Sequence, residues 1–579
     1  MDRTGWFFVI LATIGLVITL WWQQQQATEQ RARQQQQQIA QAVSPTATPA
    51  PSVAATPNVG AATTQPIAEQ RQVVPDQEAT LKDSVAVLRF SNNRGGLSAV
   101  ELLQHKAEHD QPVSLNTPTA PAIGAITQSP NDWNDSGYEL SSDATTGTAT
   151  LKRSTPENLE ITKAYTLADK AGLVDEYQTK LSITFKNNGD SEYKSPGYFV
   201  STGAAEQIHS NDRPMNTQFD WYREGKNTAI DVNWFGPKSF LFFQTGPGQD
   251  VYVQKEDKIL WAAVSNQYFT TILAPTNTAG TQAWARRVST PTQGTEPPMI
   301  GIQGALEIPA FSLAPGESKT IDFAIYSGPK EYGRLARLPN DQTDVMNFGF
   351  FKWISVLLLT SLNTLHLWVK SYALAIIIMT IIIRTLLWPI QNASTKSMRK
   401  MAKLSPLINE LRVKYKDDPQ RMNQETMKLY KEYGVNPFGG CIPMLIQIPI
   451  FFGFYGMLDK AIELRNSTFL WVHDLSQPDT VFHLANIPIN ILPLVMAGTQ
   501  VWQMSITPKT GDPAQQRILL FMPVIFLFIC YNYASALALY WTVQNLFFVA
   551  QMYLTRNQVE PQLAKVPKPS AVAKKKSYR

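Results

Sequence analysis

The stretch Ala373–Ile390, ALAIIIMTIIIRTLLWPI, decides the fold, because it is a long apolar run whose only charge is Arg384. A run of this length is typical of a transmembrane helix. An ionised side chain at membrane depth costs about 3 kcal/mol, so it usually marks a function or a partner. The other apolar runs contain no carboxylate that could answer it. We therefore expect the counter-charge of Arg384 to come from water in a cavity or from whatever the protein binds.

The rest of the 579-residue chain divides into two halves of different composition. Residues 23 to about 345 are polar, whereas residues 348–555 are mostly apolar. The net charge of +5 is modest, and both cysteines fall in apolar runs, so the polar half has no disulfide to form. Near the N-terminus, Trp6–Trp22 is long for a signal-peptide core and no cleavage site follows it, which predicts an uncleaved signal anchor. The Gln-, Pro- and Thr-rich segment after it is predicted to be a tether.

From residue 81 onward the pattern is that of an all-β domain. Short alternating runs such as Leu181–Phe185 and Thr320–Ile325 are separated by turn clusters such as Asn187–Asp190 and Ala314–Glu317. Many strands without helical periodicity between them predict one large β-sandwich.

One motif in this domain has the form of a metal site. His105–His109, HKAEH, matches H-x-x-E-H, a zinc-protease signature that requires both histidines on one helix face and a distant third ligand. Because Asp110 and Pro112 follow at once and a strand precedes it, we expect a solvated loop and no metal. The chain also lacks a P-loop, a G-x-S-x-G motif and a phosphate-binding G-x-G-x-x-G motif. We therefore expect no enzyme activity and no cofactor.

Charge parity sets the predicted topology. Segment 391–437 holds ten Lys or Arg against five acids, and the tail 555–579 holds seven against one. Positive loops stay cytoplasmic, so an even number of spans must separate the two segments. The helix predicted at 346–371 has one polar stripe and one apolar stripe, which is typical of an interfacial helix that does not cross. Its exclusion leaves six spans, with both termini in the cytoplasm and the β domain outside.

The predicted organisation follows in chain order. It comprises a signal-anchor transmembrane helix (1–22), a low-complexity linker (23–80), a periplasmic β domain (81–340), the interfacial amphipathic helix (346–371), transmembrane helix 2 (372–390), a cytoplasmic helical hairpin (391–437), transmembrane helix 3 (438–458), a periplasmic loop (459–486), transmembrane helix 4 (487–505), a cytoplasmic loop (506–517), transmembrane helix 5 (518–531), transmembrane helix 6 (534–554) and a basic cytoplasmic tail (555–579).

The hairpin has two compatible interpretations. Apolar residues recur every three or four positions on both arms, with Asp418 as the N-cap of the second arm and Pro419 at its first helical position. The two arms can simply pack against each other. They can also offer a docking surface, because methionine adapts to varied apolar partners. The residues that would form this surface are Met398, Met401, Met422 and Leu429.

Four motifs give the chain a resemblance to a known family. They are Asn436–Phe451 (NPFGGCIPMLIQIPIF), Leu470–Ser476 (LWVHDLS), Asp512–Gln516 (DPAQQ) and Phe521–Phe526 (FMPVIF). In this order they resemble the YidC/Oxa/Alb family of membrane protein insertases, in its Gram-negative form with a large periplasmic domain. The resemblance covers essentially the full chain. About ten residues around Phe482–Ile491 look inserted.

The resemblance implies a polytopic α-helical membrane protein with six transmembrane helices, whose periplasmic domain is an all-β supersandwich. It also implies a hydrophilic groove that is open to the cytoplasm and to lipid, with Arg384 in the position of the family's groove arginine. Other polar or amphipathic residues are placed to line such a groove: Thr380, Gln447, Gln500, Gln503, Trp541 and Asn545. Ordinary hydrogen bonding between helices would account equally well for Gln500, Gln503 and Asn545. Snorkelling toward the headgroups would account for Arg384.

The implied function is insertion and chaperoning of membrane proteins in the bacterial inner membrane, without a covalent catalytic residue. The implied partners are nascent membrane-protein clients, the Sec translocon with its accessory subunits, the ribosome through the basic tail and cytoplasmic loops, and the phospholipid bilayer, but no DNA. A secondary transporter with a midplane polar site is the alternative, although internal repeats and coupling carboxylates are not seen. An envelope enzyme built on the β domain is a second alternative, for which fold analogy is a weak argument.

Overall fold

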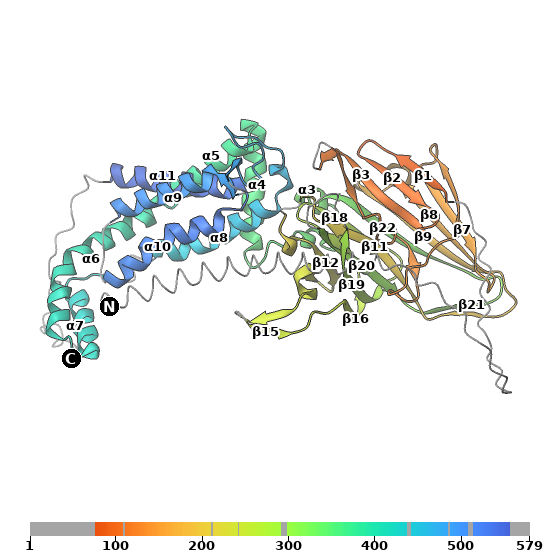
Figure 1. The fold of residues 1–579 in the computed structure, drawn as a ribbon, viewed down its shortest axis with the longest axis horizontal. Helices are drawn as coiled ribbons and strands as arrows, with labels where there is room; N and C mark the ends of the chain where they lie inside the picture. Colours follow the sequence, from red (N-terminus) through yellow and green to blue (C-terminus); the bar gives the residue numbers. More distant parts are fainter. Residues whose placement is uncertain are drawn as a thin grey trace, which may run out of the picture. The chain divides into compact units, whose positions relative to one another are not determined.

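The computed structural model describes residues 76–107, 111–209, 212–240, 243–290, 298–436, 442–484, 487–507 and 513–555 (Figure 1). The predicted anchor, nearly all of the predicted linker and the basic tail from residue 556 onward lie outside the described residues.

A nine-stranded antiparallel sheet forms the largest part of the β domain (Figure 1). In spatial order its strands are β13 (Lys226–Asp231), β12 (Gln218–Arg223), β17 (Trp261–Ser265), β18 (Phe269–Pro275), β22 (Ser318–Pro329), β9 (Gln178–Asn187), β8 (Leu159–Leu167), β7 (Thr148–Ser154) and β6 (Glu139–Asp143). Strand β8 alternates between buried and half-buried side chains along its whole length, so one face of this part of the sheet is turned to the core.

A five-stranded sheet packs against the nine-stranded sheet through β11, β17 and β20. Its strands, in spatial order, are β16 (Val251–Ile259), β19 (Gly280–Thr290), β20 (Met299–Ile308), β11 (Tyr198–Glu206) and β5 (Ile126–Thr127). Fully buried aromatic side chains such as Phe219, Trp221 and Trp261 contribute to the core. The close approach of Phe219 to Gly304 leaves no room for a side chain at that glycine, because a Cβ there would lie 2.4 Å from the ring. The predicted sandwich of sheets is therefore present.

The remaining described strands form four smaller sheets. A four-stranded sheet contains β1 (Glu78–Lys82), β2 (Ala86–Ser91), β3 (Gly96–Lys106) and β4 (Pro112–Leu115) in that order. Three two-stranded sheets pair β10 (Tyr193–Ser195) with β21 (Phe311–Leu313), β14 (Lys238–Phe240) with β15 (Phe243–Gly246), and β23 (Thr480–Leu484) with β24 (Ile487–Asn490). Strand β1 begins at Glu78, so regular structure starts slightly before residue 81, where the β domain was predicted to begin.

The alternating runs and turn clusters of the sequence lie where they were predicted. Leu181–Phe185 belongs to β9 and Thr320–Ile325 to β22, and the two strands pair with each other. The turn Ala314–Glu317 is closed by a hydrogen bond from Glu317 N to Ala314 O, and Gly316 there has a φ of 77°. Glycine tolerates this left-handed conformation without the steric cost of a Cβ.

The C-terminal half is helical. The longer helices are α4 (Lys352–Val369), α5 (Tyr372–Leu386), α6 (Trp388–Lys414), α7 (Pro419–Glu432), α8 (Ile442–Lys460), α9 (Ile491–Ile506), α10 (Pro513–Cys530) and α11 (Ser535–Leu554). Short helical segments also occur: α2 (Ala168–Ala171), η2 (Pro214–Asn216), η3 (Val232–Phe235), α3 (Tyr332–Leu335), η4 (Gln342–Met346) and η6 (Ile462–Leu464).

Several helix boundaries differ from the sequence-based expectation. Helix α5 ends at Leu386 and α6 already begins at Trp388, because Pro389 is well suited to the first turn of a helix. Residues 487–490, predicted to start transmembrane helix 4, instead form strand β24, and they belong to the segment that looked inserted. Helix α10 starts at Pro513 and is therefore longer than the predicted 518–531.

Length and composition do not settle the number of membrane spans. Among the described helices, none is by itself both long and apolar enough to cross a membrane. Helices α4 and α5 meet the criterion only as a pair, and they are bent by 119° at the break between them. The count of six spans therefore stays a prediction.

Helix α4 differs in part from the predicted interfacial helix. The polar stripe predicted for this helix consists of Lys352, Ser355, Asn363, His366 and Lys370. Of these, Ser355 is fully buried and donates a hydrogen bond of 2.9 Å to Gly453 O on α8. On the exposed side of the same helix are Trp353 and Leu357, which are 69% and 59% exposed. The polar stripe thus serves partly as a contact with α8, and large apolar side chains cover part of the free surface.

The contact between α4 and α8 depends on the absence of a side chain at Gly453. A Cβ at this position would lie 2.4 Å from Ile354 Cγ2, too close for any real contact. Gly453→Ala should therefore lower stability, because overpacking costs about 1–3 kcal/mol and exceeds the gain of about 1 kcal/mol in helix propensity. Thermal unfolding of the detergent-solubilised protein would measure the effect.

Gly498→Ala on α9 is the matched control, because nothing lies within 4 Å of a Cβ built there. This variant should unfold at the same temperature as the parent protein or slightly higher. An equal loss of stability in both variants would contradict the steric account of Gly453.

Candidate polar groove

Arg384 lies in the last turn of α5, and its guanidinium contacts an amide. Its Nη2 donates a hydrogen bond of 3.0 Å to Gln447 Oε1 on α8. No ion pair among the described residues includes Arg384, and the side chain is half-buried. An amide oxygen stabilises the guanidinium but does not neutralise it. The positive charge therefore remains available to a ligand.

Gln447 is the centre of a network that joins three helices. Its Nε2 donates to Tyr540 Oη at 3.0 Å and to Gln544 Oε1 at 3.1 Å, both on α11. Tyr540 is buried and stacks on Phe454 of α8, with ring centroids 3.9 Å apart. Both polar ends of the Gln447 amide are thus used, so its orientation is fixed. We call Arg384, Gln447, Tyr540 and Gln544 the polar network.

The other groove residues predicted from the sequence lie outside this network. Thr380 is 1% exposed, and its hydroxyl donates to Ile376 O of its own helix at 2.7 Å. Trp541 packs in an aromatic cluster with Phe451 and Phe526, at centroid distances of 5.1 and 4.7 Å. The Thr380 hydroxyl is thus satisfied within its own helix, and the Trp541 ring contributes to aromatic packing. A place for both residues in the lining of a groove stays a prediction.

Asn545 joins α11 to α9. Its Nδ2 donates to Thr499 Oγ1 at 3.1 Å and to Met496 O at 3.3 Å. This is the ordinary hydrogen bonding between helices that was one of the two interpretations of this residue. Gln500 and Gln503 also lie on α9 and are half-buried, and Gln500 Oε1 is buried without a partner among the described residues.

Tyr540 and Gln544 were not predicted from the sequence. They lie one position before Trp541 and Asn545, and both pairs have the i, i+4 spacing that places two residues on one helix face. Because α11 is buried around most of its circumference, its sequence does not show which pair faces Arg384. The polar pair at the level of Gln447 could have been found only from the packing of α8 on α11.

The hairpin residues divide between the two interpretations offered for them. Met401 and Leu429 pack against the hairpin's own small core, which is formed by Leu404, Ile408 and Val435. Met398 and Met422 are half-buried outside that core. The predicted cap is confirmed, because Asp418 accepts a hydrogen bond of 2.9 Å from Arg421 N.

Comparison with known proteins gives the chain its family. Residues 364–562 match the model of the 60Kd inner membrane protein, and residues 78–361 match the model of the YidC periplasmic domain. A membrane protein insertase YidC from Nitratidesulfovibrio vulgaris is 31% identical over 83% of this chain and 84% of its own length. The chain belongs to the YidC family of membrane protein insertases. Its β-rich domain is the periplasmic domain of that family, and its helices form the inner-membrane part.

Two further proteins are similar to this chain. The membrane protein insertase YidC of Syntrophus aciditrophicus is 40% identical, over 52% of each chain. A solved structure described as an active YidC insertase with the first transmembrane domain resolved is 18% identical, with a TM-score of 0.34 over 83% of this chain and 93% of that one. The family is not enzymatic, so this family assignment bears out the expectation that the protein is not an enzyme.

The structure places His105 of the H-x-x-E-H motif at the end of strand β3 and not in a loop. His109 lies outside the described residues. The His105 ring packs edge-on against Phe269 at 5.2 Å, and its neighbours are cationic rather than acidic. Burial, followed by the charges of Arg465 and Arg334, lowers the pKa of His105 to about 4. No group of three potential metal ligands occurs within the part of the chain that the structure describes.

This depressed pKa predicts a pH dependence of stability. The folded state binds the His105 proton less tightly than the unfolded chain, whose pKa is near 6.5, so stability should fall as the pH drops from about 6.5 to 4. We expect a loss on the order of 1–2 kcal/mol after solvent screening is considered. Thermal unfolding of the detergent-solubilised protein, followed by tryptophan fluorescence across this range, would measure it.

His105→Phe keeps an aromatic ring beside Phe269 and removes the titrating group. This variant should lose that part of the acid sensitivity, whereas His366→Phe, on α4, should retain it. An unchanged pH profile in the His105 variant would show that other groups are responsible.

Proposed function

We propose that the polar network is the centre of a client groove, through which this insertase lowers the cost of moving a polar flank into the membrane. The observation that carries the proposal is that Arg384 is held by an amide and not by a carboxylate. A carboxylate would neutralise the charge of the guanidinium, whereas the amide of Gln447 leaves Arg384 positively charged. An acidic client flank would supply the missing counter-charge.

Energetics explain why such a groove can work without a nucleotide. A client helix gains about 0.3–0.6 kcal/mol per strong apolar residue on insertion, so a span of 20 residues provides several kcal/mol. The obstacle is the polar flank, which must leave water. A hydrated groove with a positive centre offers this flank an intermediate position at lower cost. Insertion then needs no covalent step.

The membrane topology belongs to the same proposal. The protein has six spans, with both termini in the cytoplasm, and its clients are nascent membrane proteins that enter from that side. Met398 and Met422 of the hairpin are half-buried outside its small core, and this supports a docking role for the hairpin. The basic tail and the cytoplasmic loops contact the ribosome, and the Sec translocon with its accessory subunits acts beside the protein on some clients.

Arg384→Gln should impair insertion of a single-span client with an acidic leader more than insertion of the same client with a neutral leader. Loss of an interaction worth about 1 kcal/mol predicts a decrease of about fivefold for the acidic client. Arg384→Lys keeps the charge and should retain most of the activity. Protease protection of ribosome-stalled clients in reconstituted vesicles would provide the measurement.

Gln447→Glu tests the role of the Arg384 charge without changing the arginine itself. A carboxylate at this position would pair with Arg384 and remove its positive charge from the groove, so the acidic client should again be inserted less well. Gln551→Glu on α11 is the control, because Gln551 contacts Asn392 and not Arg384. Equal effects of the Arg384 variants on acidic and neutral clients would contradict the role of charge and favour a structural arginine.

A further inference from the structure

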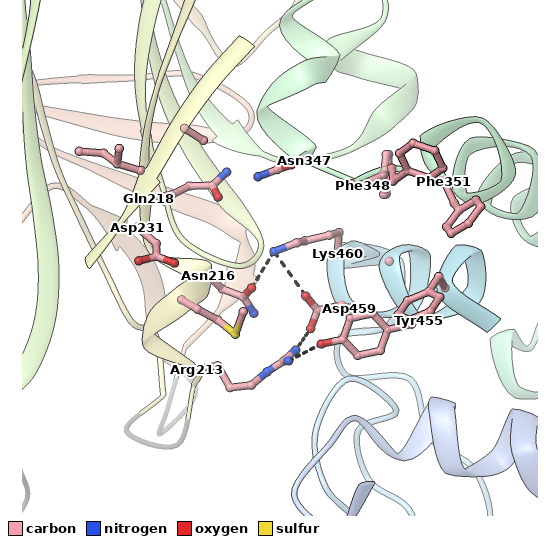
Figure 2. A pocket seen from close by; sticks show the side chains of 17 residues that line it. Arg213, Asn216, Gln218, Asp231, Asn347, Phe348, Phe351, Tyr455, Asp459 and Lys460 are labelled. Atoms are coloured by element: carbon pink, nitrogen blue, oxygen red, sulfur yellow. Dashed lines mark hydrogen bonds and ion pairs between the residues drawn. The ribbon is translucent and has the colours of Figure 1, made fainter. Parts of the chain in front are cut away.

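A cavity of about 540 Å³ lies where the periplasmic domain meets the helices (Figure 2). Residues of η2, β12 and β13 line it on one side, and residues 347–351, just before α4, and the last turns of α8 line it on the other. Its lining has two chemically different halves. One half is polar and charged, with Arg213 and Asn216 on the side of the periplasmic domain and Asp459 and Lys460 on α8. The other half is aromatic. An amphipathic ligand would match both halves.

The cations of the polar half are held in place by neighbours. Arg213 forms an ion pair with Asp459 and donates a hydrogen bond of 2.9 Å to Tyr455 Oη. Lys460 donates a hydrogen bond of 2.7 Å to Asn216 Oδ1 and lies 3.3 Å from the carboxylate of Asp459 (Figure 2). The cationic groups are therefore preorganised at the edge of the cavity and lose little freedom when a ligand binds.

Asn216 leaves one polar atom without a partner. The residue is 4% exposed, and its Oδ1 is already occupied by Lys460. Its Nδ2 is buried and has no hydrogen-bond partner among the described residues. A buried amide donor costs free energy unless an acceptor is supplied. The cavity thus lacks an acceptor oxygen at a position beside two cationic side chains, which is the environment that a phosphate group prefers.

The formal charges of the lining sum to zero. Arg213 and Lys460 are balanced by Asp459, which pairs with both, and by Asp231. One carboxylate oxygen of Asp231 caps the helical segment η3 by accepting from Asn233 N at 2.8 Å and from Trp234 N at 3.2 Å. An anionic ligand would be attracted by the cations but opposed by Asp231. A zwitterion with a phosphate and an ammonium group complements both ends.

The aromatic half gives the ligand its apolar part. Phe351 and Phe452 stack with ring centroids 6.1 Å apart, and both line the cavity. Phe350 also lines it and is 93% exposed, which is a large apolar surface to leave in water. Trp353, one turn further along α4, is 69% exposed. Aromatic side chains of this kind are enriched where a protein meets the headgroup region of a bilayer.

We propose that this cavity binds a zwitterionic phospholipid with a primary ammonium, as in a phosphoethanolamine headgroup, taken from the periplasmic leaflet. The phosphate accepts from Asn216 Nδ2 beside Lys460, and the ammonium lies toward Asp231. The acyl chains follow the aromatic side chains from Phe351 to Phe350. The lipid thus connects the periplasmic domain to the membrane surface at α4, and this role does not depend on the client groove.

The test uses the full chain in detergent and phosphatidylethanolamine with a photoreactive group on its acyl chain. Mass spectrometry should locate the label on the segments that contain Phe350 and Phe452. Unlabelled phosphatidylethanolamine should compete at least tenfold better than phosphatidylglycerol. Equal competition by inorganic phosphate or by free phosphoethanolamine would overturn the proposal in favour of a soluble ligand, and better competition by phosphatidylglycerol would overturn the zwitterionic assignment.

Asn216→Asp is the decisive variant, because it keeps the oxygen that accepts from Lys460 and replaces the free donor with a second oxygen. Labelling should fall at least tenfold, with an unchanged unfolding temperature. Asn423→Asp makes the same exchange at an exposed position of α7 and should label like the parent protein. Undiminished labelling of the Asn216 variant would overturn the proposal.

Asp231→Asn decides the question if the Asn216 variant does not fold. Asparagine caps a helix as well as aspartate does, so the local structure should persist. This variant should lose the preference for phosphatidylethanolamine over phosphatidylglycerol while it still takes up label. A preserved preference would show that Asp231 does not bind the ammonium and would overturn the assignment of the headgroup.

Discussion

The helical half of the structure depends on how one half-buried cation is held. Arg384 lies in a helix whose other side chains are almost all apolar, and a lone guanidinium in such surroundings is costly. The structure reduces this cost with an amide that is itself fixed by Tyr540 and Gln544. This chain of contacts joins α5, α8 and α11. A carboxylate would have reduced the cost further, but it would also have removed the charge that the proposed function uses.

In the contact between the periplasmic domain and α8, charged side chains are held differently from Arg384. There, opposite charges are paired, as in Arg213 with Asp459, and neighbouring amides complete the contact, since Gln267 donates to Asp459 O at 2.9 Å. Charges deeper in the periplasmic domain respond to their burial. Burial raises the pKa of Asp220 to about 6 and lowers the pKa of Lys330 well below its ordinary value. The charge of Arg213 is thus neutralised where the periplasmic domain meets α8, whereas Arg384 among the helices keeps its charge.

The sequence predicted the class of each half correctly, and it failed where packing decides. Alternation in β9 and β22 identified strands because the pleat repeats every two residues. The capped start of α7 was equally predictable, because Asp418 and Pro419 act locally. In contrast, the two i, i+4 pairs on α11 are equivalent in sequence, and only the neighbouring helix distinguishes Tyr540 from Trp541. The start of α9 was missed for a similar reason, since residues 487–490 are apolar enough for a helix but pair as a strand with β23.

Helix α11 is buried along nearly its whole length and packs against α5, α8 and α9, which all precede it in the chain (Figure 1). During synthesis the earlier helices must therefore enter the bilayer without Tyr540 and Gln544, and Gln447 has no partner on α11 until α11 itself has been made. Before α11 is in place, the polar side chain of Gln447 lacks its partners within the membrane, as the polar groups of a partly inserted client do. An insertase of this design is therefore itself a demanding substrate for the insertion machinery already present in the cell.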